Sequence, residues 1–254
     1  MTIAGKPAAA GASQLAHMLD DAYTVTVLTG AGISTESGIP DFRSPGGIWS
    51  KFRIIDYSEF MADEAARLED WKRRFCMEDQ LGVVKPNIGH EIIARWVRSG
   101  HCQTVITQNI DGLHQLAGTP EKAIIEIHGN ARHASCTKCG LGHTIAECRK
   151  SISKTGRAPV CRKCGGIVKS DVVMFGQKMP EEETANAFRA AESCDLFIAI
   201  GTSLVVHPAA SLPIAARRAG ARLVIINREP TDMDPFADLL IHDGIGETFR
   251  CLAA

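Results

Sequence analysis

The chain has 254 residues, 45% of them hydrophobic, and its 28 basic and 29 acidic side chains leave a net charge of −1. This balance argues against a dedicated nucleic-acid binder, and no apolar run is long enough to span a membrane. Nine cysteines without an export signal favour metal ligands and buried thiols over disulfides, so we expect a cytoplasmic protein.

Apolar, β-branched runs alternate with amphipathic helical patterns along the chain. Strands are expected at 23–28, 104–107, 123–127, 196–200, 222–226 and 239–241. Helices are expected at 88–98, 181–193 and 208–219, each followed or preceded by glycine or proline. This alternation predicts an α/β fold with a mostly parallel sheet covered on both faces.

Two segments interrupt the alternation and are interpreted as one smaller inserted module. Residues 51–85 are charged and helical without strands, and residues 132–169 carry four cysteines in two C-x-x-C pairs, with a fifth at Cys148. The sheet domain would then be discontinuous and comprise 13–50, 86–131 and 170–254. Residues 1–12 are small and polar and are expected to be disordered.

The most informative segment follows the first predicted strand. Gly30 and Gly32 allow a tight turn and a close approach of the backbone to a ligand, as in phosphate-binding loops. Thr35 stands where the dinucleotide fingerprint of dehydrogenases has its third glycine, which argues against hydride transfer. An acid, an aromatic ring and a cation follow at Asp41, Phe42 and Arg43.

Two C-x-x-C knuckles predict one structural zinc ion in the second inserted segment. Each knuckle is followed by glycine, and together they offer four thiolates, which would leave no open coordination position. A redox-active C-x-x-C pair is the alternative, and His143 or Cys148 could replace one ligand. The expected ligands are Cys136, Cys139, Cys161 and Cys164.

Polar residues also follow the other predicted strands, where α/β sheets bind ligands. Gln108, Asn109 and Asp111 could hold a ribose and a carboxamide, or form an Asx-type turn. His128 could act as a general base or be a structural residue. Further candidates for phosphate and ribose contacts are Gly201, Thr202, Ser203, Asn227, Arg228 and Glu229.

This ordered set of motifs resembles the sirtuin family of NAD-dependent protein-lysine deacylases, of the bacterial type with a single catalytic core. The resemblance runs from about residue 25 to residue 247. Its motifs are GAGIS at 30–34, GIPDFR at 38–43, KPN-x-x-H at 85–90, TQNIDGLH at 107–114, HG at 128–129, VV-x-FG at 172–176 and GTSL-x-V-x-PAA at 201–210.

The resemblance implies a Rossmann-like domain with a small zinc-bearing domain, and NAD+ as a consumed co-substrate. It implies that Ser34, Asn109 and Asp111 hold the nicotinamide carboxamide and that His128 is the general base. Other implied NAD+ contacts are Gly30, Ala31, Gly32, Asp41, Phe42, Arg43, Trp49, Gln108, Ile110, Gly201, Thr202, Ser203, Asn227, Arg228, Glu229 and Ile245. The acyl-lysine peptide would contact Ile110, Val173, Phe175, Gly176 and Val205.

The implied products are nicotinamide, O-acyl-ADP-ribose and free lysine. Family members that prefer acidic acyl groups carry Tyr-x-x-Arg where this chain has Trp71 and Arg74. We interpret Trp71 as a packing residue and the arginines as solvated, and expect simple or apolar acyl groups to be preferred. Alternative functions are ADP-ribosyl transfer, NAD+ hydrolysis, and a non-enzymatic NAD-sensing zinc-ribbon module.

Overall fold

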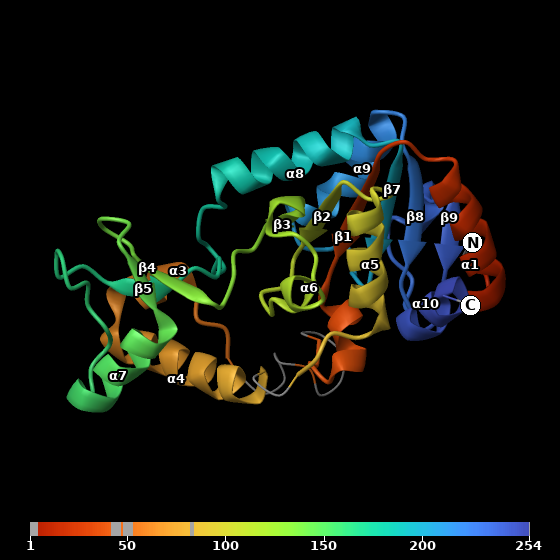
Figure 1. Ribbon diagram of the computed structural model, residues 1–254. Helices are drawn as coiled ribbons and strands as arrows, with labels where there is room; N and C mark the ends of the chain where they lie inside the picture. Colours follow the sequence, from red (N-terminus) through yellow and green to blue (C-terminus); the bar gives the residue numbers. More distant parts are fainter. Residues whose placement is uncertain (1–4, 42–46, 48–52, 82–83, 254) are drawn as a thin grey trace.

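Six parallel strands form the central sheet of the computed structural model, which describes residues 5–41, 47, 53–81 and 84–253. The strand order is β3-β2-β1-β7-β8-β9, with β1 in the middle (Figure 1). β1 and β7 are buried along their whole length, as their β-branched and aliphatic residues predict. The strands are β1 (Val25–Thr29), β2 (Thr104–Thr107), β3 (Ile124–Glu126), β7 (Leu196–Ile200), β8 (Arg222–Ile226) and β9 (Leu239–Ile241).

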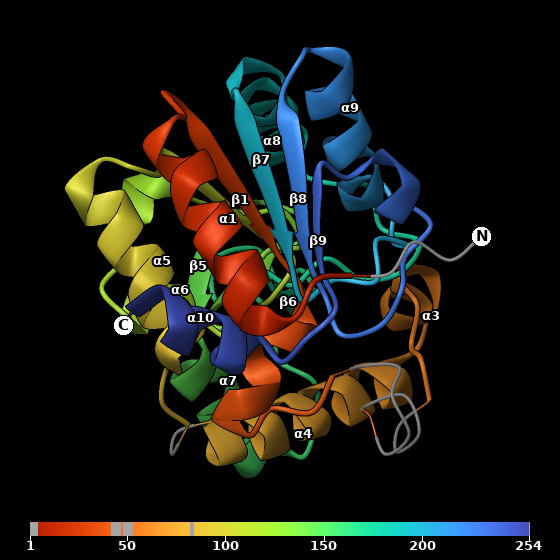
Figure 2. The ribbon, with the colours of Figure 1, turned by 90° about the vertical axis from the view of Figure 1, so that its right-hand side faces the viewer.

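Helices cover both faces of this sheet (Figure 2). The first face packs against α1 (Ala8–Asp20), α5 (Ile88–Ser99) and α10 (Ile245–Ala253). The second face packs against α8 (Glu181–Ser193) and α9 (Leu212–Arg218). Successive residues of a strand point to opposite faces of the sheet and pack in two separate hydrophobic cores. Val27, for example, belongs to the core on the first face and Leu28 to the core on the second.

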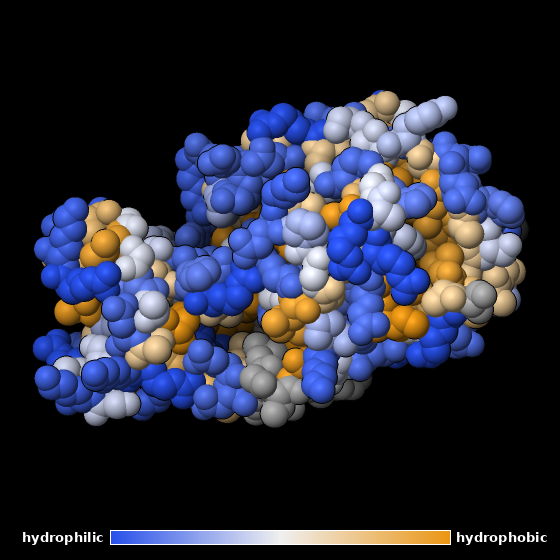
Figure 3. Space-filling model, viewed as in Figure 1, coloured by the Kyte–Doolittle hydropathy of each residue, from blue (hydrophilic) through white to orange (hydrophobic). Residues whose placement is uncertain are grey.

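A smaller unit lies beside the carboxyl edge of the sheet and is separated from it by a notch in the surface (Figure 3). Its antiparallel sheet has the order β5-β4-β6, formed by β4 (His133–Cys136), β5 (Gly142–Thr144) and β6 (Val168–Ser170). The helices of this unit are α3 (Tyr57–Ala62), α4 (Glu64–Leu81) and α7 (Ile145–Thr155). Trp71 and Phe75 of α4 pack against β4 and β6, so both inserted segments share one core.

The remaining short elements are α6 (Leu113–Leu116), η1 (Ala31–Ser37), η2 (Glu121–Ala123), η3 (Ala209–Ser211) and η4 (Asp234–Phe236). The predicted fold class, a Rossmann-like parallel sheet with a four-cysteine module, is confirmed. The residue boundaries of the two domains stay predictions. None of the described helices is long and apolar enough to cross a membrane.

The prediction of disorder for residues 1–12 is wrong for residues 8–12, which are the first turns of α1. Ala8 and Ala12 are buried, and a Cβ at Gly11 would lie 2.7 Å from Ile241 of β9. The small side chains of this segment therefore allow the helix to pack closely on the sheet and are not a sign of disorder. The helix expected at 208–219 is divided into η3 and α9.

Candidate active site

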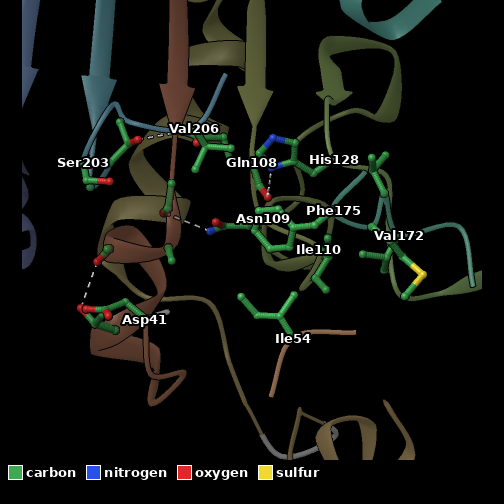
Figure 4. A pocket seen from close by; sticks show the side chains of 18 of the residues that line it. Asp41, Ile54, Gln108, Asn109, Ile110, His128, Val172, Phe175, Ser203 and Val206 are labelled. Atoms are coloured by element: carbon green, nitrogen blue, oxygen red, sulfur yellow. Dashed lines mark hydrogen bonds between the residues drawn. The ribbon is translucent and has the colours of Figure 1, made fainter. Parts of the chain in front are cut away.

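A cavity of about 680 Å³ lies where the carboxyl edge of the large sheet meets the small unit, and its volume suits a small-molecule site. Loops after β1, β2, β7 and β8 form much of its wall, together with residues 172–177 (Figure 4). The predicted site residues in the wall are Gly30, Ala31, Gly32, Asp41, Gln108, Asn109, Ile110, His128, Val173, Phe175, Gly176, Gly201, Thr202, Ser203, Asn227, Arg228, Glu229 and Ile245.

Some predicted site residues are not in the described part of this wall. Ser34 is only 1% exposed and lies behind the glycine turn, where Asp111 contacts it. Val205 is half exposed beside Val206, and it is Val206 that lines the cavity. Three predicted NAD+ contacts lie outside the described residues: Phe42, Arg43 and Trp49.

The glycine turn packs tightly against the loop after β7. The amide of Gly32 donates to the carbonyl of Gly201 at 2.8 Å, and that of Gly30 donates to Ile200 at 3.1 Å. A Cβ at Gly30 or Gly32 would lie 2.7–2.8 Å from atoms of Gly201 or Thr202. These glycines are therefore required for the approach of one loop to another, in addition to any role toward a ligand.

Ser34, Asn109 and Asp111 form a hydrogen-bonded cluster in which Asn109 lines the cavity and the other two residues lie behind it. The Asn109 amide donates to Ser34 Oγ at 3.1 Å, and Ser34 Oγ donates to Asp111 Oδ2 at 2.7 Å. Asp111 Oδ1 also accepts the amide of Leu113 at 2.9 Å, so this carboxylate both starts α6 and holds Ser34. The Asx-type turn is therefore present, and the same residues lie next to the glycine turn, while their binding of a ribose or a carboxamide stays a prediction.

Buried histidines support this cluster from behind. His90 is fully buried within 3.5 Å of Ser34 Oγ, and burial lowers its pKa to about 4, against the influence of Asp111. His114 lies within hydrogen-bonding distance of Thr29 Oγ1, and burial lowers its pKa to about 3. Both rings are thus neutral at physiological pH. Sequence reasoning gave them no role, although both belong to the quoted motifs.

His128 lines the cavity, and its Nε2 has no hydrogen-bond partner among the described residues. Its Nδ1 lies 3.1 Å from the carbonyl oxygen of Gln108, which can only accept, so the proton is on Nδ1 and Nε2 carries the lone pair. Burial lowers the pKa of His128 below 6.5, and the bond to Gln108 opposes this in part. The neutral, basic form therefore dominates at neutral pH, as a general base requires.

The segment 172–177 forms the wall beside His128. The amide of Val173 donates to the carbonyl of His128 at 2.9 Å, which joins this wall to the histidine. Phe175 is 49% exposed at the mouth of the cavity. An apolar, partly open surface thus lies next to His128.

Trp71 and Arg74 lie on α4 at the opposite side of the cavity from the sheet. Trp71 is fully buried, which confirms its interpretation as a packing residue. Arg74 is not solvated as expected: it lines the cavity and pairs with Asp70 at 2.6 and 3.2 Å, and both side chains are largely buried. Asp70 therefore neutralises the cation on this part of the wall.

The four predicted cysteine ligands form one cluster at the edge of the small sheet. Their sulfur atoms all lie within 4.8 Å of one another, and two of the pairs are 3.5 and 3.7 Å apart. Tetrahedral zinc with Zn–S bonds of about 2.3 Å requires sulfurs about 3.8 Å apart, so the arrangement fits. His143 and Cys148 are not part of this cluster of possible ligands among the described residues.

The fold and the site define an α/β protein with a four-cysteine module and a histidine in the wall of a cavity at its strand ends, which is where such proteins bind nucleotides. Residues 30–208 match the model of the Sir2 family. The chain is 50% identical to NAD-dependent protein deacetylase 1 of Bradyrhizobium diazoefficiens, over 94% of this chain and 93% of that one. It is also 50% identical to the NAD-dependent protein deacetylase of Rhodopseudomonas palustris, over 94% of each.

Solved structures agree with this result. A complex of Sir2 with a p53 peptide and NAD+ superposes with a TM-score of 0.82 at 35% identity, covering 93% of this chain and 95% of that one. Sir2Tm bound to a propionylated peptide gives 0.84 at 33% identity, covering 94% and 95%. This chain belongs to the Sir2 family, the sirtuins, as its motifs predict.

Proposed function

We propose that this cavity performs NAD-dependent deacylation of protein lysines, with deacetylation as the main activity, so that the chain is a protein deacylase. The products would be nicotinamide, O-acyl-ADP-ribose and free lysine. One observation carries the proposal: in a Sir2-family chain, neutral His128 lies in the cavity wall beside the Ser34–Asn109–Asp111 cluster. A base and a polar cluster at adjacent strand ends suit chemistry on a dinucleotide.

The residues of the cavity fit NAD+ as the co-substrate. The loops after β1 and β7 would hold the pyrophosphate, with Ala31, Gly32 and Ser203 in the wall. Asn227 and Glu229 at the end of β8 would hold the adenine ribose. Ser34, Asn109 and Asp111 would bind the nicotinamide carboxamide, and their mutual hydrogen bonds fix them before the ligand arrives.

His128 would act after the acyl oxygen of the substrate has captured the ribose carbon and nicotinamide has left. Its Nε2 would accept a proton from a ribose hydroxyl, and that oxygen would then attack the captured acyl group. The carbonyl of Gln108 keeps the proton on Nδ1 throughout, which preserves the basic nitrogen. The acyl-lysine would lie between Ile110, Val173 and Phe175, all of which line the cavity.

The four cysteines would hold one structural zinc ion. The fit of the cluster supports this assignment, and so does the absence of all four cysteines from the described cavity wall. A metal with four protein ligands supplies no open position for substrate, so its contribution would be to folding. The cytoplasmic location expected from the cysteine content stays a prediction.

The acyl preference is expected to be acetyl or butyryl over succinyl. Because Asp70 is paired with Arg74, a succinyl carboxylate would have to compete with the Asp70 carboxylate for this cation. Mass spectrometry of products from NAD+ and a matched set of acetyl-, butyryl- and succinyl-lysine peptides measures this preference. Fastest turnover of the succinyl peptide would contradict it. Nicotinamide release without deacylated peptide would instead identify NAD+ hydrolysis or ADP-ribosyl transfer.

The rate of deacylation is expected to decline only at acidic pH. Protonation removes the lone pair of His128 Nε2, and burial holds the pKa of this histidine below 6.5. The rate should therefore be constant just above pH 6.5 and fall as the pH drops through the lowered pKa. The pH profile of kcat/KM for an acetyl-lysine peptide at saturating NAD+ tests this. A His128-dependent decline that begins well above neutrality would refute it.

A further inference from the structure

Lys169 on β6 is a buried cation to which the proposed reaction gives no role. It is only 6% exposed, and its Nζ donates to the carbonyl oxygens of Ser170 and Val172, each at 2.6 Å. An ammonium group removed from water is costly unless its N–H groups have acceptors. The two carbonyls supply them, so the chain turns around this ammonium between Ser170 and Val172.

The charged groups that act on Lys169 come from two elements. Asp70 and Arg74 belong to α4, and Asp171 follows β6 directly. Burial, which is the largest influence, and the nearby Arg74 together lower the pKa of Lys169 to about 8, although the two carboxylates oppose this. The ammonium form is therefore the main one at neutral pH, which is the form with three donors.

The turn that Lys169 holds lies directly against His128. A Cβ at Gly129 would lie 1.9 Å from the carbonyl oxygen of Asp171, so the two backbones touch. The amide of Val173 donates to the carbonyl of His128 at 2.9 Å. The same turn opens the segment 172–177, which forms one wall of the cavity. One cation thus fixes both the start of this wall and the backbone of the base.

We propose that Lys169 is a positioning residue. By binding the carbonyls of Ser170 and Val172, it orients the segment 172–177 to receive the acylated peptide and keeps the backbone of His128 next to that segment. The inference rests on the proposed function, because it assigns the peptide to this wall. Lys169 is not among the described residues that line the cavity, and its Nζ donates to main-chain carbonyls instead. The peptide site should therefore depend on it far more than the dinucleotide site does.

The test compares Lys169→Met and Lys169→Arg with the unmodified full-length protein, using NAD+ and an acetyl-lysine peptide. The methionine variant loses two buried hydrogen bonds that a charged group donates. We expect its peptide KM to rise by about tenfold or more and its kcat to fall, while its KM for NAD+ stays within about twofold of the unmodified value. The arginine variant should recover most of the peptide KM, because guanidinium can donate to two carbonyls. Lys154→Met, on exposed α7, is the matched control and should behave as the unmodified protein.

Three results would overturn the inference. The first is a folded Lys169→Met protein with unchanged peptide KM. The second is an equal rise in the KM values for peptide and NAD+, and the third is an arginine variant no better than the methionine variant. If the methionine variant does not fold, Lys169→Gln is compared with Lys169→Arg instead. Equal peptide KM values for these two variants would show that the charge of Lys169 has no role. An unmodified protein without peptide-dependent nicotinamide release would instead reject the proposed function.

Discussion

Replacing His128 with alanine is expected to reduce deacylation by a factor of about 10²–10⁴, the usual contribution of a general base. The reason is geometric: Nε2 is the basic nitrogen in the cavity wall, and Nδ1 is committed to Gln108. Cleavage of the bond to nicotinamide requires no base on the ribose hydroxyl. The variant should therefore retain part of the exchange of free nicotinamide into NAD+ while losing the deacylated peptide.

Two measurements on each variant make this test specific. Deacylated peptide is quantified by mass spectrometry, and nicotinamide exchange is followed with labelled nicotinamide. His101→Ala is a suitable control, because His101 is exposed beside the end of α5 and contacts Ser99. Undiminished deacylation in the His128 variant would remove this histidine from the reaction. Equal loss of both activities would point to a damaged NAD+ site.

Removal of the metal is expected to unfold the small unit and to abolish activity indirectly. The knuckle residues Cys136 and Cys161 belong to the same core as Trp71 and Phe75 of α4. Without the metal, the four thiolates would repel one another, and the hydrophobic core that contains Cys136 and Cys161 would lose its packing. Structural zinc stabilises small domains by about 10–16 kcal/mol in peptide systems, more than a unit of this size can replace.

The measurement pairs metal content with thermal unfolding and tryptophan fluorescence during titration with a chelator. Trp71 is fully buried in the affected core, so its emission should report the loss of packing. Cys161→Ala should give the same result as chelation, whereas Cys251→Ala, at an exposed cysteine, should not. Full folding and activity after stoichiometric removal of the metal would show that the cluster has no structural role.

The sheet could be predicted because its strands are continuous apolar runs. β2, β7, β8 and β9 begin and end at the expected residues, and β1 differs only by a shift at its ends. Strand ends also indicated most of the site, since polar residues there have few structural reasons to follow buried runs. The helix from Glu181 to Ser193 was recognisable by the proline before it and the acids in its first turn.

Other features depend on contacts between distant residues and carry no local signal. The pairing of Asp70 with Arg74 neutralises one of the arginines that line the cavity, yet an i,i+4 pair of this kind is usually a solvated surface feature. The sequence does not distinguish Lys169 from the exposed basic residues near the cysteines, because only the structure shows that it is buried. The capping box of Asn87 and His90 could have been found, because Asn87 directly precedes the periodic residues of α5.

The hydrogen bonds between the ends of β1, β7 and β8 have a consequence for affinity. Gly30 donates to Ile200, Gly32 donates to Gly201, and Gly201 donates to Ile226, so the ends of three neighbouring strands are joined by the backbone of the protein itself. A dinucleotide that binds there meets a preorganised cradle and has to immobilise little of this backbone. The backbone at this end of the cavity is therefore ordered when the protein folds, so that binding would lose little further conformational entropy there.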